Sequence, residues 1–437
     1  MKNMLPKNWV ETTIGDLFTL RQGIQVSKPD QSLEFKKGMV QFLRIVDFTK
    51  TNELARYVTD PGETYHMQKD DIALVRYGTV GFVCYGKTGV IANNLFRVIP
   101  NIDINKKYVT YYLKSSGFQH SLVSKGATMQ ALSFKTVNPI LFPLPPLAEQ
   151  QRIVAKLDEL FLHLDSLKNR LNNIPKILKN FRQAVLTQAV TGKLTEEWRV
   201  GKELEEWQNH KLNDLCLSIT DGDHQAPPRA ATGVPFLVIS NVSKGYFDFE
   251  SVTRYVPKDY FESLKYTRVP KLGDVLYTVT GSYGISLLVN FDKEFCFQRQ
   301  IAILKPDNSK LDSLYLNYGL SSSLLMNQAH NVATGTAQKT VPLRGIKSFE
   351  LPLPPKKEQT EIVKRIKHLF TKAAAIEAQY QSLKAKIDSL PQAILAKAFK
   401  GELVEQLYTD GDAKELLKEI EKLKSELSGK KKVAKKK

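Results

Sequence analysis

The feature that constrains this chain most is an internal repeat whose two copies lie 209 residues apart. Residues 143–161 and 352–370 share ten identical residues across nineteen aligned positions. The match continues without a gap through Gln183/Gln392, Ala184/Ala393, Leu186/Leu395, Ala189/Ala398, Gly192/Gly401 and Leu194/Leu403. Solenoid modules repeat every ~20 to 50 residues, so a repeat of this spacing is a duplicated structural unit. We therefore expect two equivalent halves and a ligand that also has two parts.

Each copy contains apolar residues that alternate spacings of three and four, which predicts a helix packed lengthwise on another helix. The predicted seam consists of Ile153, Leu157, Leu160, Leu164, Leu167 and Leu171 in the first copy, and Ile362, Ile366, Leu369, Ala373, Ile376 and Tyr380 in the second. Pro175 and Pro391 should end or kink the helices, which leaves each about 25 to 35 residues long. Because the seams agree in register and length, we expect an antiparallel pair with the two preceding domains at its opposite ends.

The segments outside these helices contain short apolar and β-branched runs separated by Gly, Pro, Asn and Asp, a pattern typical of strands joined by turns. They are distant copies of each other, as shown by Trp9/Trp207, Phe42/Phe236, Asp71/Asp274, Gly78/Gly281 and Gly81/Gly284. The predicted fold class is α+β. It has two β-rich domains (1–142 and 199–351), each followed by a conserved helical region (143–198 and 352–405), and a short helix with a lysine-rich tail (406–437).

The chain is basic, with a formal net charge of +18 and a pI near 9.5. Six lysines between Lys430 and Lys437 account for part of that charge, but the remaining excess still favours a polyanionic partner such as nucleic acid. The cysteines, Cys84, Cys216 and Cys296, show neither CxxC nor paired spacing. This argues for a reducing cytoplasm and against a disulfide frame or structural zinc. The lack of a signal peptide or long apolar run predicts no membrane association.

Several segments resemble catalytic motifs but lack the residues or the structural context that those motifs require. Residues 81–88 match the phosphate-loop pattern GxxxxGK[ST], but residues 82–85 resemble a strand and residues 89–94 make a poor helix start, so we expect a β-hairpin. Asn138-Pro139-Ile140 lacks the second proline and the aromatic residue of the Asn-Pro-Pro motif that amino-methyltransferases use. No GxGxxG loop is present, and the seven histidines are dispersed without ligand spacing. The sequence predicts no active site in this chain.

The order of these elements resembles the specificity subunits of type I restriction-modification enzymes. The resemblance rests on the two PLPP-x-x-EQ helices, each ending in Ala-x-x-Gly-x-Leu and each preceded by a variable basic domain, and it covers residues 5–405. It implies two target-recognition domains, double-stranded DNA as ligand and no catalysis by this subunit. It also implies two methyltransferase subunits that use S-adenosylmethionine and restriction (motor-nuclease) subunits that use ATP and Mg²⁺. The expected location is the cytoplasm of a bacterium or archaeon.

Base-reading side chains are expected in the loop after the Asp71 strand, just upstream of the first helix, and at the corresponding places in the second domain. The candidates are Arg76, Tyr77, Thr79, Lys125, Thr128, Gln130, His224, Thr280, Ser282, Tyr283, Thr336, Gln338 and Lys339. The alternative interpretation is that these residues are solvated turn residues and surface caps.

Three other classes of protein remain open from the residues alone. A free-standing DNA-binding regulator could use the same duplicated scaffold. A single-chain modification and restriction enzyme would need the missing cofactor and Asn-Pro-Pro motifs. A structural coiled-coil linker would explain the helices but not two diverged basic β-rich domains.

Overall fold

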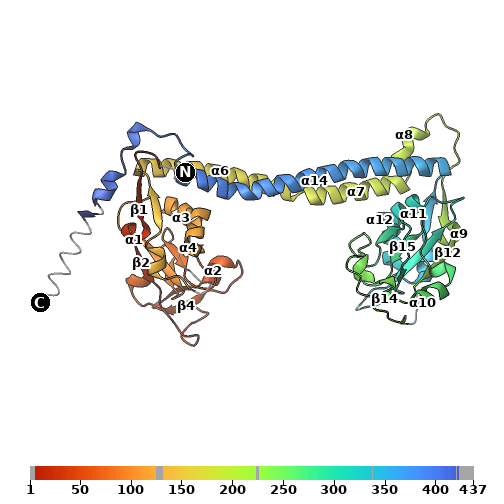
Figure 1. Ribbon diagram of the computed structural model, residues 1–437, viewed down its shortest axis with the longest axis horizontal. Helices are drawn as coiled ribbons and strands as arrows, with labels where there is room; N and C mark the ends of the chain where they lie inside the picture. Colours follow the sequence, from red (N-terminus) through yellow and green to blue (C-terminus); the bar gives the residue numbers. More distant parts are fainter. Residues whose placement is uncertain (1–4, 125–130, 223–225, 337, 420, 423–437) are drawn as a thin grey trace. The chain divides into compact units, whose positions relative to one another are not determined.

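The computed structural model describes residues 5–124, 131–222, 226–336, 338–419 and 421–422 (Figure 1). The chain divides into two compact units. Unit 1 comprises Met1–Leu171 and Leu383–Lys437, and unit 2 comprises Asn172–Ser382. Each unit combines short strands and helices with a part of the long conserved helices, which confirms the predicted α+β class.

Unit 1 contains two four-stranded sheets and a two-stranded ribbon. The first sheet has the order β2 (Phe18–Gln22), β9 (Leu95–Pro100), β6 (Ile72–Val75), β7 (Val83–Cys84). The second has the order β4 (Arg56–Thr59), β3 (Met39–Leu43), β8 (Gly89–Ile91), β5 (His66–Met67), and β1 (Val10–Thr13) pairs with β10 (Leu141–Leu144). The helical segments are α1 (Ile14–Leu17), α2 (Ile45–Thr49), α3 (Lys106–Lys114), α4 (Ser116–Ser124), α5 (Phe134–Val137), α6 (Leu147–Asn172), η1 (Glu63–Tyr65) and η5 (Tyr408–Asp410).

Unit 2 has a similar arrangement, except that its second sheet has three strands in the described residues. Its sheets are β12 (Cys216–Asp221), β18 (Ile301–Pro306), β15 (Val275–Thr278), β16 (Ser286–Leu288), then β14 (Tyr255–Val256), β13 (Val234–Leu237), β17 (Cys296–Phe297), and the ribbon β11 (Gln208–Lys211) with β19 (Glu350–Leu353). The helical segments are α7 (Ile174–Val190), α8 (Glu196–Arg199), α9 (Leu212–Leu215), α10 (Lys258–Ser263), α11 (Ser313–Leu320), α12 (Ser323–Val332), α13 (Leu343–Lys347), η2 (Lys193–Thr195), η3 (Ile239–Asn241) and η4 (Tyr266–Arg268). Even the parallel pairing is duplicated, because β3 pairs with β8 as β13 pairs with β17.

The conserved helices pair antiparallel within each unit. Helix α14 (Lys356–Lys400) contributes its last part to unit 1 and its first part to unit 2. In unit 1, Ile153 and Leu157 of α6 share a hydrophobic core with Leu395 and Ala398 of α14. In unit 2, the end of α7 packs against the start of α14 (Figure 1). In each unit the apolar seam therefore packs one conserved helix on the other, as the heptad pattern predicts.

The structure departs from the predicted seam at two positions. Leu167 is 46% exposed and Ile376 is 48% exposed, because a single partner helix covers only a narrow stripe of each helix surface. The two copies also differ in length. A break at Asn173 separates α6 from α7, whereas α14 continues through Pro391 for 45 residues in all. Proline removes one helical hydrogen bond, but burial of Leu395 against unit 1 stabilises the turns that follow.

The Glu-Gln pair that recurs in both copies holds each β-rich part to its helix. In unit 1, buried Glu149 accepts hydrogen bonds from Trp9 Nε1 (2.9 Å) and Gln406 Nε2 (2.6 Å). In unit 2, buried Glu358 accepts them from Trp207 Nε1 (3.0 Å), Thr195 Oγ1 (2.7 Å) and the guanidinium of Arg199. The following glutamine is equally placed, because Gln150 donates to the Pro145 carbonyl and Gln359 to the Pro354 carbonyl, each at 2.9 Å. Burying a carboxylate requires such partners, which explains why both residues persist in the two copies.

The segment that matches the phosphate-loop pattern, residues 81–88, is not followed by a helix. Its strand-like part forms β7, which pairs with β6, and the next element after Thr88 is strand β8. The hairpin is therefore β6–β7, and β8 belongs to the other sheet. The expected C-terminal helix is present in part: residues 414–419 are helical, and Leu416 packs on the unit 1 core. Ile420, Leu423 and Leu427, which follow Leu416 at helical spacing, and the lysine-rich tail lie outside the described residues.

Candidate nucleic-acid interface

Four chain segments meet at one end of the first sheet in each unit. In an antiparallel sheet the end of one strand lies beside the start of its neighbours, so the loops leaving β2 and β6 gather beside the turn that precedes β9. We call these segments the loop cluster. In unit 1 it consists of residues 22–25, 76–81, 92–94 and 132–133. In unit 2 it consists of residues 221–222, 279–284, 298–300 and a fourth segment whose described residues are 334–336 and 338–341.

Backbone hydrogen bonds hold the loop cluster of unit 1 together. The N–H of Gly23 donates to the carbonyl of Leu95 (3.1 Å), and the N–H of Arg76 donates to the carbonyl of Asn94 (2.8 Å). The N–H of Leu132 then donates to the carbonyl of Arg76 (2.6 Å). Because these bonds use main-chain atoms, the arrangement does not depend on which side chains the loops carry.

Unit 2 makes the same bonds with different residues. The N–H of Gly222 donates to the carbonyl of Ile301 (3.4 Å), that of Val279 to the carbonyl of Gln300 (2.9 Å), and that of Val341 to the carbonyl of Val279 (2.8 Å). Val279 therefore occupies the position equivalent to Arg76. The two loop clusters share a backbone scaffold and differ in the side chains that it presents.

A glycine makes the close approach of these segments possible in each unit. A Cβ at Gly23 would lie less than 3.0 Å from the carbonyl oxygens of Ile91 and Ala92. A Cβ at Gly222 would lie equally close to the carbonyl oxygen of Phe297 and within 2.6 Å of the carbonyl carbon of Gln298. Backbone atoms within a sheet cannot move aside, so only glycine fits at both positions.

An aspartate fixes the opposite end of the strand that leads into the cluster. Burial would raise the pKa of Asp71, but the N–H of Gln68 and the cations of Lys106 and Arg97 hold that pKa below its ordinary value. The equivalent Asp274 pairs with the buried Lys305, and burial raises its pKa. Both carboxylates fix where the strand begins, and thereby where its loop emerges.

The predicted residues of unit 1 occupy different environments. The Arg76 side chain is half-buried: its Nε donates to the carbonyl of Leu132 (3.2 Å), and its guanidinium lies 5.5 Å from the Phe96 ring centre. Arg76 thus braces two segments of the cluster. Tyr77 is 38% exposed, and its hydroxyl donates to Asn93 Oδ1 (3.0 Å).

Thr79 lines a hollow of about 600 Å³ beside the unit 1 cluster. The hollow is also lined by Phe82, Tyr85, Lys114 and Gln119. Lys114 Nζ donates to the Tyr85 hydroxyl (2.9 Å) and lies 4.2 Å from the centre of that ring. The hollow therefore combines exposed aromatic surface with a cation, which are the groups that contact nucleic acid.

In unit 2 the structure brings the two predicted segments together. Thr280 forms an isolated bridge with Thr340, and the Tyr283 hydroxyl bonds to His330 Nδ1 at 2.7 Å. The exposed candidates of this unit are Ser282, Thr336, Gln338 and Lys339. The remaining candidates, Lys125, Thr128, Gln130 and His224, lie outside the described residues. None of these positions is shown here to contact DNA, and all remain predictions.

The sequence interpretation missed the turn that precedes β9 and its counterpart before β18. Asn93 lies in the first turn and the exposed Arg299 in the second, and the cluster also includes Gln22 and Gln25. The signal that could have revealed Gln22 and Gln25 is Gly23/Gly222, because aligning these glycines places Asp221 and His224 at the equivalent positions.

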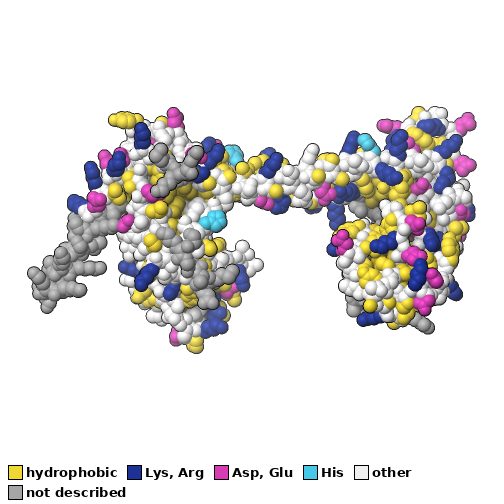
Figure 2. All heavy atoms as spheres, viewed as in Figure 1, with side chains coloured by type: hydrophobic (Ala, Val, Ile, Leu, Met, Phe, Trp, Pro, Cys, Tyr) yellow, Lys and Arg dark blue, Asp and Glu magenta, His cyan; other side chains and the backbone are white. Residues whose placement is uncertain are grey.

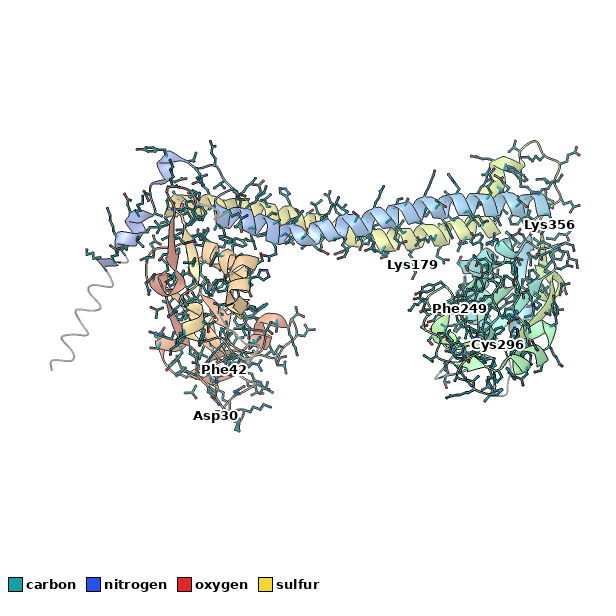
Figure 3. All side chains as sticks on the ribbon, in the orientation of Figure 1. Asp30, Phe42, Lys179, Phe249, Cys296 and Lys356 are labelled. Carbon is teal, nitrogen blue, oxygen red and sulfur yellow. The ribbon has the colours of Figure 1, made fainter. Side chains whose placement is uncertain are left out.

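Charge is distributed over the units without a single basic patch on the face shown in Figure 2, where Lys and Arg are interspersed with Asp and Glu. Figure 3 marks Lys179 on α7 and Lys356 at the start of α14, two cations of unit 2 that lie on the helix pair and not in the loop cluster. Within the described residues, no group of three or more His, Cys, Asp or Glu side chains could hold a metal ion. No helix in the described ranges combines the length and apolar character needed to cross a membrane.

The chain combines duplicated β-rich domains, each with a loop cluster and a conserved helix, and comparison with known proteins shows which family has this organisation. The model of the type I restriction modification DNA specificity domain matches residues 6–176 and again residues 204–385. The chain belongs to this family of specificity subunits, which recognise DNA and are not the catalytic subunits of their systems.

Individual relatives support the assignment. The chain is 30% identical to the type I restriction enzyme EcoBI specificity subunit of Escherichia coli, over 98% of this chain and 95% of the relative. It is 36% identical to the EcoKI specificity subunit of E. coli strain K12, over 76% of this chain and 74% of the relative. The crystal structure of the HsdS subunit from Thermoanaerobacter tengcongensis shares the fold, with a TM-score of 0.60 at 19% identity over 91% of this chain and 98% of that chain.

Proposed function

We propose that this specificity subunit reads a bipartite, asymmetric DNA sequence, with the loop cluster of each unit reading one part. The observation that carries the proposal is that the two clusters share their backbone hydrogen bonds but present different side chains. A shared scaffold places both clusters against DNA in the same way, whereas different side chains read different bases. The basic excess of the chain would contribute salt-dependent affinity through phosphates.

Catalysis in this proposal belongs to other subunits. The chain would recruit two methyltransferase subunits that use S-adenosylmethionine, together with restriction subunits that use ATP and Mg²⁺, in the cytoplasm of the host cell. Two identical partners need two equivalent platforms, and the repeated Glu-Gln helices supply them. The target adenine would be flipped into a methyltransferase pocket.

Selection from randomised duplexes, with the chain and its methyltransferase subunits together, tests the proposal. We expect enrichment of two defined sequence elements separated by a fixed number of unread base pairs. A single contiguous motif, or no enrichment, would contradict it. The alternative function, a free-standing regulator, predicts sequence-specific binding by the chain alone and no methyltransferase in a pull-down.

The helix pair should set the gap between the two elements. Inserting one heptad into α6 and one at the facing level of α14 adds about 10 Å. Suitable insertion points are Lys168 in α6 and Asp388 in α14, which face each other. The pKa of Asp388 is lowered first by Lys384 and, more weakly, by the charge of Lys168, so the two residues are close in space. At about 3.4 Å per base pair, the preferred gap should grow by roughly three base pairs. Repeating the selection measures the gap, and an unchanged gap would show that the helices do not act as a ruler.

Charge reversal on the two helix platforms should weaken the capture of one methyltransferase subunit at a time. Arg152 and Arg365 are poor choices for this test, because both stabilise the fold. Arg152 forms an ion pair with Asp410, and Arg365 donates a hydrogen bond to the Leu194 carbonyl. Lys156→Glu in unit 1 and Lys364→Glu in unit 2 should each weaken one of the two binding steps by roughly fivefold, or about 1 kcal/mol. Native mass spectrometry would show the loss as a shift from two bound subunits to one.

Lys50→Glu is the control, because Lys50 is exposed and lies outside the conserved helices. An equal loss at both sites would argue against separate platforms.

A further inference from the structure

The turn that precedes β9 and its counterpart before β18 occupy the centre of each loop cluster. In unit 1 the turn is pinned on one side by the Arg76 N–H to the Asn94 carbonyl (2.8 Å) and on the other by the Gly23 N–H to the Leu95 carbonyl (3.1 Å). Equivalent bonds pin the unit 2 turn at Gln300 and Ile301. The middle residue of each turn is therefore held at the same place on the scaffold. That residue is an asparagine in one unit and an arginine in the other.

Asn93 is oriented by a network of polar side chains. Its Nδ2 donates to Gln25 Oε1 (3.1 Å), its Oδ1 accepts from the Tyr77 hydroxyl (3.0 Å), and its backbone carbonyl accepts from Gln22 Nε2 (3.0 Å). An asparagine amide has two N–H donors and two acceptor lone pairs. The network uses one of each, so one donor and one acceptor stay available side by side. That pair matches N7 and the N6 amino group on the major-groove edge of adenine.

Arg299 is exposed and, within the described part of the chain, forms no hydrogen bond or ion pair. Its five N–H donors are therefore available. The planar guanidinium fork matches O6 and N7 on the major-groove edge of guanine, which no other side chain contacts as well in two places at once. Hydrogen bonds on both sides of the turn fix the backbone at Arg299, so this long side chain extends toward a base from a defined position.

We propose that Asn93 and Arg299 are specificity-determining residues, with Asn93 selecting an adenine in the element read by unit 1 and Arg299 selecting a guanine in the element read by unit 2. This inference rests on the proposed function, since it names which residue reads which base. The contrasting possibility for Arg299 is a phosphate contact, which would carry no sequence information.

The experiment uses the chain assembled with its methyltransferase subunits and duplexes in which every position of the wild-type target is varied singly. For Arg299→Ala we expect preference to be lost at one base pair of one element, by about ten- to hundredfold, with the other element unchanged. Arg299→Lys should keep overall affinity and weaken the guanine preference, because the cation remains but its planar fork is lost. Lys347→Ala, an exposed cation at the end of α13, is the matched control and should change no position.

Asn93→Asp tests unit 1 in the same assay, because it keeps the shape of the side chain and removes both donors. We expect the adenine preference to disappear at one base pair of the other element, with the folded state unchanged by circular dichroism. A uniform loss of affinity across all sequences, or unchanged preferences in these variants, would overturn the assignment. Failure of the proposed function would look different, because the wild-type complex itself would then show no preference at any position.

Discussion

Replacing Gly222 with alanine should abolish recognition of one DNA element while leaving the other readable. The added Cβ would lie less than 3.0 Å from backbone atoms of Phe297 and Gln298, which the sheet holds in place. The segment must therefore move away from the turn, and the unit 2 cluster loses its arrangement. Because more than one base contact depends on that arrangement, we expect methylation of the target to fall by about a hundredfold or more.

Selection with randomised duplexes reports which element is lost, and Gly23→Ala should give the mirror result in unit 1. Gly245→Ala and Gly38→Ala are the controls. Both have positive φ and meet nothing within 4 Å of an added Cβ, so alanine there adds a backbone strain that Gly23 and Gly222 do not carry, but no clash. Equal loss of both elements in Gly222→Ala would indicate a general folding defect and contradict the separate roles of the two clusters.

Glu358→Ala should cause the largest loss of stability in unit 2. The fully buried carboxylate joins Thr195, Arg199 and Trp207 to the start of α14. Removing it leaves the Arg199 guanidinium without its anion and two further donors unsatisfied, at a cost of about 3 to 5 kcal/mol. Urea unfolding gives the size of the loss. Hydrogen exchange locates it, because the amides of β11 and β19 should exchange faster.

Two comparisons test the physical reason for this loss. Glu149→Ala in unit 1 removes a carboxylate whose partners, Trp9, Asn8 and Gln406, are neutral, so the expected loss is smaller, about 1 to 3 kcal/mol. Glu197→Ala, an exposed carboxylate near Arg199, should change stability by less than about 0.5 kcal/mol. A loss at Glu358 no larger than that at Glu197 would rule out the carboxylate as an anchor.

The sequence was most informative where structure follows from local periodicity or from duplication. The a/d spacing located the helix pair, because helical periodicity is a property of consecutive residues. The repeat also showed that both β-rich domains share a fold. It could not show that Leu167 and Ile376 would be exposed, since burial depends on how far one partner helix covers another.

The loop clusters could be predicted only in part. Each combines segments far apart in the chain, joined by backbone bonds such as that from Leu132 to Arg76, and sequence patterns carry little information on such long-range pairing. The loop after the Asp71 strand was predicted because its glycines recur in both copies. Asn93 and Arg299 were missed because they are chemically unlike, although the scaffold makes them equivalent.

The central claim is that this chain supplies sequence recognition for a reaction carried out by its partners. Methylation-sensitive sequencing of genomic DNA tests it most directly, in a methylation-free bacterial host that expresses the methyltransferase subunit with or without this chain, or this chain alone. The account predicts adenine methylation on both strands of one bipartite motif only when both proteins are present. Methylation by this chain alone, or the same methylated motif without it, would contradict the account.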